Sequence, residues 1–310
     1  MKLEYIKCNI CGKDDYSFLL SGRDYRYNYK KEFNVVKCNQ CGLIYLNPRP
    51  TFESIIKLYE RDYTPEDIIN SSLITKTANW KIIIKGILYR LYGYIGKLPK
   101  NAKILEVGCG EGNILEILLK RGCEIWGVEP NPKASEICKK KGLNVLCSSL
   151  EEANFGNGSF EVVIMSQVLE HLPSPKRSLK EVNRIVKHGG KVYIYCPNAE
   201  SYLSKFFGKY WHGWHIPFHF YNFTQKTIFK LTNDVGFNIK KIGTATPPHF
   251  FTISLKSFLR SENENILANK IGKILDTFPV RISLLPIFKI LDFVLKGKGD
   301  CLRIELVKRK

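Results

Sequence analysis

Few acidic residues and no long apolar run occur in this sequence. Its 310 residues include 29 Asp and Glu against 48 Lys and Arg, which gives a formal net charge of +19. No run of about 18 apolar residues occurs, so the sequence predicts no membrane-spanning helix. The first fifteen residues also lack the apolar core of a secretory signal peptide. Both absences lead us to expect a cytoplasmic protein.

Positive charge is most concentrated in the last third of the chain, where residues 201–310 hold 18 Lys and Arg against 7 Asp and Glu. A basic surface suggests an anionic partner, although solvated lysines would give the same count with no partner. The segments 80–97 and 281–299 combine apolar stripes with Lys and Arg, as helices in a membrane interface do. We favour packing of these segments within the protein over peripheral membrane contact. Nucleic acid is not an expected partner, because the sequence holds no known nucleic-acid-binding module.

Four of the ten cysteines form two closely spaced pairs near the N-terminus. Cys8 and Cys11 are followed, after a gap of 26 residues, by Cys38 and Cys41, and a glycine follows each pair. Two such pairs supply four thiolates for a tetrahedral ion, and structural zinc is the expected metal; redox pairs and iron are the alternatives. The other six cysteines are expected to be buried thiols. Without an export signal we expect no disulfide framework.

From residue 103 onward, strand-like and helix-like segments alternate. Strand-like stretches occur at 103–107, 124–130, 144–149, 160–166 and 191–197, and helix-like stretches at 114–122, 133–142 and 175–190. This alternation indicates βαβ units and a parallel sheet covered on both faces. A further helix, with Thr224 as its N-cap and Gly236 at its end, precedes strand-like stretches at 237–246 and 301–309.

The segment ILEVGCGEGN (104–113) places three alternate glycines between a strand and a helix. Glycines let a ligand approach the backbone closely, which makes such a turn a candidate cofactor site. Glu129, at the end of the next strand, could hold both hydroxyls of a ribose. A dinucleotide fingerprint would require Gly or Ala where the chain has Asn113. Glu106 would also repel a pyrophosphate but would attract a ligand with an ammonium and a cationic centre.

These motifs resemble those of class I S-adenosylmethionine-dependent methyltransferases. ILEVGCGEGN is similar to the family's first motif and VEPN (128–131) to its ribose-binding motif. Residues 148–175 are similar to the adenine-contacting stretch and the fourth strand, and 189–198 to the fifth strand. The resemblance covers about 100–245 and returns at 301–309. It implies an α/β fold with a Rossmann-like, doubly wound sheet of seven strands, the last one antiparallel.

The resemblance also implies a set of donor-binding residues at the ends of the strands. Glu106 and the three glycines would hold the methionine end, Glu129 the ribose, and Ser149, Leu150 and Gln167 the adenine side. Ser149 stands where Asp often contacts the adenine amine. The full set is Glu106, Gly108, Cys109, Gly110, Gly112, Asn113, Glu129, Pro130, Ser149, Leu150, Ser166 and Gln167.

The cysteine pairs, the NPRP segment (47–50) and the methyltransferase motifs together resemble a subgroup that acts on sugars or other small metabolites. The resemblance implies a small zinc-ribbon-like module at 1–50 and a helical linker at 51–99. A methyltransferase domain would follow at 100–310, with a basic helical insertion at 247–299.

Methyl transfer to a hydroxyl also requires a base, which is usually a histidine. Five of the six histidines lie between 171 and 219. His171 follows the fourth predicted strand, next to the expected position of the methyl group. His215 and His219 lie in WHGWHIPFHFYNFT (211–224), which resembles the subgroup's loop after the fifth strand. Our order of preference for the catalytic base is His219, His171, His215.

We therefore expect an S-adenosylmethionine-dependent methyltransferase with a structural zinc ion. Its acceptor would be a small-molecule hydroxyl, sugar-like or lipid-linked, beside Trp211, Trp214 and Tyr221. C- or N-methylation of a small metabolite is the alternative reaction. A non-catalytic adaptor that binds zinc and the methyl donor is the alternative class, and a nicotinamide dehydrogenase is disfavoured by Asn113 and Glu106.

Overall fold

The computed structural model describes residues 1–25, 29–62, 98, 101–262, 274–275 and 277–309 of the chain. Its centre is a seven-stranded sheet with the order β12-β13-β10-β9-β6-β7-β8. The strands are β6 (Lys103–Val107), β7 (Glu124–Val128), β8 (Val145–Leu146), β9 (Phe160–Ser166), β10 (Val186–Pro197), β12 (Phe237–Ala245) and β13 (Cys301–Lys308). Strand β13 pairs antiparallel with both β10 and β12, whereas β10, β9, β6, β7 and β8 are mutually parallel. The predicted α/β sheet with an antiparallel last strand is confirmed.

Helices cover both faces of this sheet because the central strands are apolar on both sides. Leu105 and Val107 of β6 belong to one buried cluster, and Ile104 of the same strand belongs to another. The covering helices are α4 (Asn113–Leu119), α5 (Pro132–Lys140), α6 (Pro175–Ile185) and α8 (Gln225–Asp234). Thr224 caps α8 through a capping box, as its position in the sequence predicts. Helix α6 ends earlier than predicted, since residues 186–190 already belong to β10.

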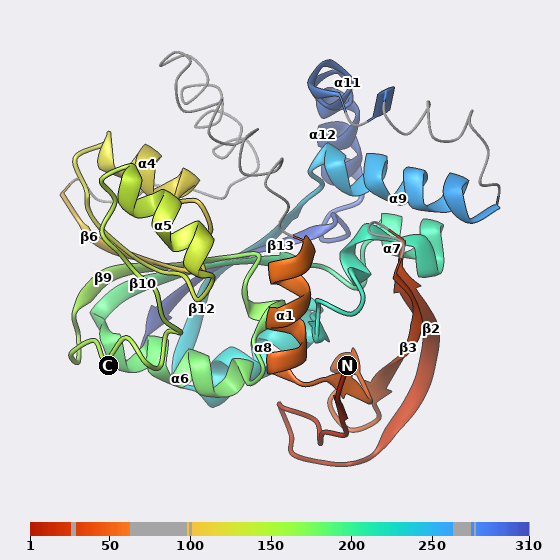
Figure 1. Ribbon diagram of the computed structural model, residues 1–310, viewed down its shortest axis with the longest axis horizontal. Helices are drawn as coiled ribbons and strands as arrows, with labels where there is room; N and C mark the ends of the chain where they lie inside the picture. Colours follow the sequence, from red (N-terminus) through yellow and green to blue (C-terminus); the bar gives the residue numbers. More distant parts are fainter. Residues whose placement is uncertain (26–28, 63–97, 99–100, 263–273, 276, 310) are drawn as a thin grey trace.

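The N-terminal region forms a second sheet, with the order β11-β4-β3-β2. Strands β2 (Tyr16–Asp24) and β3 (Tyr29–Cys38) form a long curved hairpin, which the sequence analysis did not predict (Figure 1). Strand β4 (Ile44–Leu46) pairs with β11 (Tyr221–Asn222), so a segment that follows β10 completes the N-terminal sheet. The short strands β1 (Leu3–Glu4) and β5 (Arg49–Pro50) pair separately. Helix α1 (Phe52–Asp62) follows at the predicted position.

A third group of elements lies at the far end of the hairpin, where Figure 1 shows α7 and α9 close to the tip of β2 and β3. Its short helices are α7 (Tyr202–Phe207), η2 (Gly208–Tyr210) and η3 (His212–Trp214), with η1 (Leu169–His171) beyond β9. Trp211 and Trp214 pack with Phe33 of the hairpin and Phe250 of α9 in one buried cluster.

The predicted basic insertion contains three of the described helices, α9 (Pro248–Glu262), α11 (Phe278–Ser283) and α12 (Leu285–Val294). The basic segment 80–97, and most of the predicted linker, lie outside the described residues. In the described part of the chain, no helix combines the length and the apolar character needed to cross a membrane. The proposed domain limits stay predictions.

Candidate functional site

The glycine turn lies at the carboxyl end of β6, in the centre of the parallel strands. Gly108, Gly110 and Gly112 have φ angles of 63°, 52° and 76°, in the region that favours glycine. A Cβ atom at Gly108 would lie 2.7 Å from Cγ2 of Val168, the residue that precedes η1. A Cβ atom at Gly110 would meet nothing within 4 Å, so a ligand can approach this glycine. Gly110 is therefore the open position of the turn, and Gly108 packs against the residue that precedes η1.

Two carboxylates flank the turn. Glu129, at the end of β7, accepts hydrogen bonds from the backbone of Gly110 at 2.8 Å and of Asn131 at 2.9 Å. Burial raises the pKa of Glu129, and these two hydrogen bonds oppose the rise. Glu129 is thus held at the open face of the turn, where a carboxylate can accept hydrogen bonds from a ribose.

Glu106, in β6, is 3 % exposed, and its Oε2 atom has no hydrogen-bond partner among the described residues. Burial, followed by the nearby Cys138 and Glu129, raises the pKa of Glu106 well above its ordinary value. A buried carboxylate oxygen without a partner carries a free-energy cost of roughly 1–3 kcal/mol, which a ligand with an ammonium group would offset. The residues at the turn therefore fit a cationic, ribose-containing cofactor.

The other predicted donor residues lie at the same edge of the sheet, at the ends of β7, β8 and β9 or beside the glycine turn. Ser149 donates from Oγ to Glu152 at 2.7 Å, and the Leu150 side chain is buried in the main apolar cluster. Gln167 has a φ of 56° and donates from Nε2 to Sγ of Cys301 at 3.4 Å. The remaining members are Cys109 (buried), Asn113 (first residue of α4), Pro130 (exposed) and Ser166 (end of β9).

All three predicted catalytic histidines come together at the end of η1, which contains His171. The ring centres of His171 and His219 are 4.5 Å apart, and those of His215 and His219 are 4.9 Å apart. A turn brings the last two together, since the carbonyl of His215 accepts from the backbone of His219 at 3.1 Å. His212 extends this cluster to His249 on α9, whose ring centre lies 5.9 Å away. No sequence pattern had linked His249 to the site.

Burial changes the protonation of these histidines. Burial lowers the pKa of His171 to about 4, although a hydrogen bond with the Phe218 carbonyl opposes the shift. Burial, with a contribution from His171, also lowers the pKa of His219 well below its ordinary value. Both imidazoles are therefore neutral at neutral pH, a state in which each carries one nitrogen lone pair.

Glu170, in η1, adjoins the cluster and was not predicted as a site residue. It is fully buried, and neither carboxylate oxygen has a hydrogen-bond partner in the described structure. Its Oε1 atom is 4.0 Å from Nε2 of His219. Burial raises the pKa of Glu170 to about 8. The sequence signal that could have pointed to Glu170 was its position next to His171, which was a predicted site residue.

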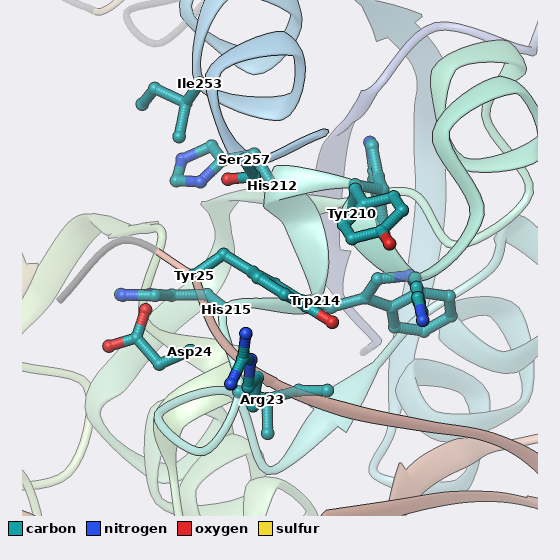
Figure 2. Close-up of a pocket in the computed structure, with 12 residues that line it drawn as sticks. Arg23, Asp24, Tyr25, Tyr210, His212, Trp214, His215, Ile253 and Ser257 are labelled. Carbon is teal, nitrogen blue, oxygen red and sulfur yellow. The ribbon is translucent and has the colours of Figure 1, made fainter. Parts of the chain in front are cut away.

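A pocket that is partly open to solvent adjoins the histidines. Figure 2 shows Arg23 and Asp24 on one side and Ile253 and Ser257 on the other. The pocket thus lies between the β2–β3 hairpin, the 209–216 segment and α9. Its lining residues are Arg23, Asp24, Tyr25, Lys209, Tyr210, Trp211, His212, Trp214, His215, Ile216, Ile253 and Ser257. Of the predicted catalytic residues, His215 is the one that lines it.

Asp300 anchors the aromatic segment to the end of β10 and the start of β13. Its Oδ1 atom accepts from Nε1 of Trp211 at 2.7 Å and from Oγ of Ser201 at 2.6 Å. Burial raises the pKa of Asp300 to about 7 despite these hydrogen bonds. Tyr221, predicted as a neighbour of the acceptor, lies in β11 instead of in the pocket wall.

The four N-terminal cysteines converge as their spacing predicts. Their sulfur atoms all lie within 4.8 Å of one another, with 3.3 Å between Cys8 and Cys41 and 3.5 Å between Cys11 and Cys38. The backbone NH groups of Gly12 and Gly42 close the two turns onto the carbonyls of Cys8 and Cys38. Four thiolates around a tetrahedral zinc ion lie about 3.8 Å apart, so this arrangement fits a structural zinc ion.

Comparisons with known proteins bear on the central sheet and its glycine turn. A family model described as a methyltransferase domain matches residues 83–242, which is just over half of the chain. A methyltransferase from Thermotoga maritima, whose structure is known, is 21 % identical and has a TM-score of 0.52. The alignment covers 82 % of this chain and 99 % of that protein, and it supports the fold alone.

Curated relatives match over a shorter stretch. A ubiquinone biosynthesis O-methyltransferase of Coxiella burnetii is 28 % identical over 117 residues, which cover 35 % of this chain and 50 % of the relative. The protein of the same name from Idiomarina loihiensis is 32 % identical over 110 residues, covering 33 % and 45 %. The chain spans about half the length of the curated relatives it matches.

Proposed function

The chain belongs to the family of methyltransferase domains, and we propose that it is an S-adenosylmethionine-dependent class I methyltransferase that methylates a hydroxyl of a small molecule. The acceptor would occupy the pocket between the β2–β3 hairpin, the 209–216 segment and α9. One observation carries this proposal. His215 lines that pocket and also contacts the histidines beside η1, at the edge of the sheet where the glycine turn lies.

The donor would lie along the glycine turn. We assign its ammonium group to Glu106 and its ribose to Glu129, because Oε2 of Glu106 is buried without a partner among the described residues and the Glu129 carboxylate faces the open position at Gly110. The bound donor supplies a methyl group on a positively charged sulfur. Residues at the turn act by orienting that methyl group toward η1, and orientation accounts for much of the rate of such displacements.

The lining of the pocket suggests the chemistry of the acceptor. Tyr25, Tyr210 and Trp214 offer aromatic surfaces, and Arg23 and Lys209 add positive charge. This combination favours a ring-shaped molecule that carries a hydroxyl and an anionic group, such as a sugar phosphate. The relatives named O-methyltransferases support transfer to oxygen instead of nitrogen or carbon.

The pocket changes our order of preference for the catalytic base. His215 faces the proposed acceptor site, whereas Nε2 of the buried His219 points toward Glu170. We therefore propose that His215 takes the proton of the acceptor hydroxyl, with His171 and His219 behind it. The four cysteines would hold zinc and, through β2 and β3, keep Arg23 and Tyr25 in the pocket wall.

The test uses labelled S-adenosylmethionine and a panel of sugar phosphates, polyprenyl phenols and small amines. The expected product carries the methyl group on oxygen, as identified by NMR, and His215→Ala should lower kcat by about 100-fold. His188→Ala, which changes an exposed histidine of β10, is the matched control. Binding of S-adenosylhomocysteine without methylation of any hydroxyl, or methylation at nitrogen or carbon, would refute the proposed reaction.

A further inference from the structure

The carboxylate of Glu170 is buried and faces the histidine cluster. The residue is 0 % exposed, and neither side-chain oxygen has a hydrogen-bond donor in the described structure. The gap of 4.0 Å to Nε2 of His219 is too long for a hydrogen bond. A fold that buries a carboxylate in this way needs a cation or a proton there to offset the cost.

Two imidazoles are oriented around this carboxylate by backbone carbonyl groups. Nδ1 of His219 lies 2.8 Å from the Gly213 carbonyl, and Nδ1 of His171 lies 3.0 Å from the Phe218 carbonyl. A carbonyl oxygen can only accept, so both Nδ1 atoms are donors, and in the neutral rings both Nε2 atoms carry lone pairs. Hydrogen bonds of this kind commonly fix the orientation of histidines that bind metals.

We propose that Glu170, His171 and His219 form a binding site for a divalent transition-metal cation, separate from the four cysteines. One potential ligand atom from each residue lies within 4.8 Å of the others. A cation with bonds of about 2.1 Å holds its ligand atoms roughly 3–4 Å apart, so only a small contraction is required. Two imidazoles and a carboxylate suit zinc, cobalt, manganese or iron(II) and leave coordination positions for an external ligand.

The position of the site gives the cation a role, and this step rests on the proposed function. The site lies on η1 directly after β9, and His215 connects it to the acceptor pocket. A hydroxyl oxygen bound to the cation loses its proton more readily, and His215, the proposed base, takes that proton. The oxygen then forms a bond to the methyl carbon while the carbon–sulfur bond breaks, and the bonding electron pair stays on sulfur. The products are the methyl ether and S-adenosylhomocysteine.

Titration with Co²⁺ distinguishes the two metal sites in the full-length protein. Cobalt bound to thiolates gives intense charge-transfer absorption, whereas cobalt bound to imidazole and carboxylate gives weak d–d bands alone. The wild-type protein should bind one cobalt ion of each kind. Glu170→Gln and His219→Gln should lose the weak bands, with at least a 10-fold loss of affinity at that site, and keep the thiolate absorption as a sign of intact folding.

Glu136→Gln, which changes an exposed acid of α5, is the control and should keep both sets of bands. A wild-type protein without the second set of bands would overturn the inference. So would a Glu170→Gln variant that binds the second cobalt ion as tightly as the wild type. Calorimetry with S-adenosylhomocysteine distinguishes a failure of the metal site from a failure of the proposed function, because donor binding at the glycine turn does not require the second cation.

Discussion

Nη1 of Arg49 donates a hydrogen bond of 2.9 Å to the hydroxyl of Tyr221, and the two residues are 172 positions apart in the chain. The same guanidinium donates to the Pro173 carbonyl at 3.0 Å and to Glu4 at 2.8 Å, and it lies 4.7 Å from the centre of the Phe220 ring. One buried side chain thus ties the β1–β5 pair to the loop after η1 and to β11, the segment that follows the histidines.

Replacement of Arg49 should therefore destabilise the protein more than loss of its tyrosine partner. We expect Arg49→Met to lower the free energy of unfolding by about 2–4 kcal/mol, since buried acceptors lose their donor. Tyr221→Phe removes one hydroxyl and should cost about 1 kcal/mol. Urea denaturation measures both. Equal effects of the two changes would contradict the central position that we assign to Arg49.

Removal of the metal from the four cysteines should affect the acceptor more than the donor. Cys41→Ser should lose one equivalent of zinc, lower the melting temperature and raise the KM for the acceptor, because β2 carries Arg23 and Asp24 in the pocket wall. The affinity for S-adenosylhomocysteine should change less than threefold. Cys123→Ser, at a buried cysteine of a different cluster, is the control and should keep its zinc. Unchanged metal content in Cys41→Ser would refute this assignment.

Glu106 makes opposite contributions to stability and to donor binding. Glu106→Gln should keep or raise the melting temperature, because the amide removes a buried acid, yet weaken S-adenosylhomocysteine binding by at least 10-fold. The raised pKa of Glu106 adds a pH dependence. Since the ligand's ammonium prefers the ionised acid, wild-type affinity should fall as pH drops below that pKa. Calorimetry should find a smaller pH dependence for the variant, and identical profiles would exclude Glu106 as the partner.

Gly108→Ala tests the contact between the glycine turn and η1. The added methyl group would meet Val168 at 2.7 Å, and the residue has a φ of 63°. Gly142→Ala is a matched control, with a φ of 73° and nothing within 4 Å. Each change should cost roughly 1 kcal/mol of stability from the backbone. Gly108→Ala should in addition lower kcat at least 10-fold, and equal kcat values in the two variants would refute a link between turn and η1.

Asp300 should make the protein less stable as pH rises, which is the opposite of the usual effect of a carboxylate. Its pKa is about 7 in the folded protein and close to the ordinary 3.8 in the unfolded chain, so the folded state binds more protons between these values. The free energy of unfolding should therefore fall as pH rises from about 4 to 7, by at most about 1.4 kcal/mol per pH unit. The free energy of unfolding of the Asp300→Asn variant should fall less steeply over this range, as measured by urea denaturation at each pH. Parallel curves would refute the effect.

The central sheet and the glycine turn could be predicted because their signals are local. The alternation of strand and helix from residue 103 depends on neighbouring residues, and the turn combines glycines with a strand end and a helix start. Thr224 and Gly236 likewise mark the ends of α8 through contacts within a few residues. The clustering of the four cysteines could be predicted from their spacing and from the preference of metals for four thiolates.

The acceptor side could not be predicted because its contacts are distant in the sequence. Tyr25 and Tyr210 line one pocket with a ring distance of 5.1 Å, yet the hairpin that brings them together carries no motif. His249 approaches His212 only because α9 packs against η3. Glu170 stands beside a predicted histidine, but its complete burial depends on the packing of β11 and η1, which appears only in three dimensions.

The pairing of β4 with β11 has a consequence for the newly made chain. During synthesis, the edge of β4 is exposed to the cell from the moment it emerges until residues 221 and 222 leave the ribosome. The first fifty residues therefore cannot complete their sheet by themselves. A gene fusion that transfers them alone would leave the edge of β4 unpaired and able to pair with strands of other chains. Exchange of this region between related enzymes should succeed only when the segment around Tyr221 is exchanged with it.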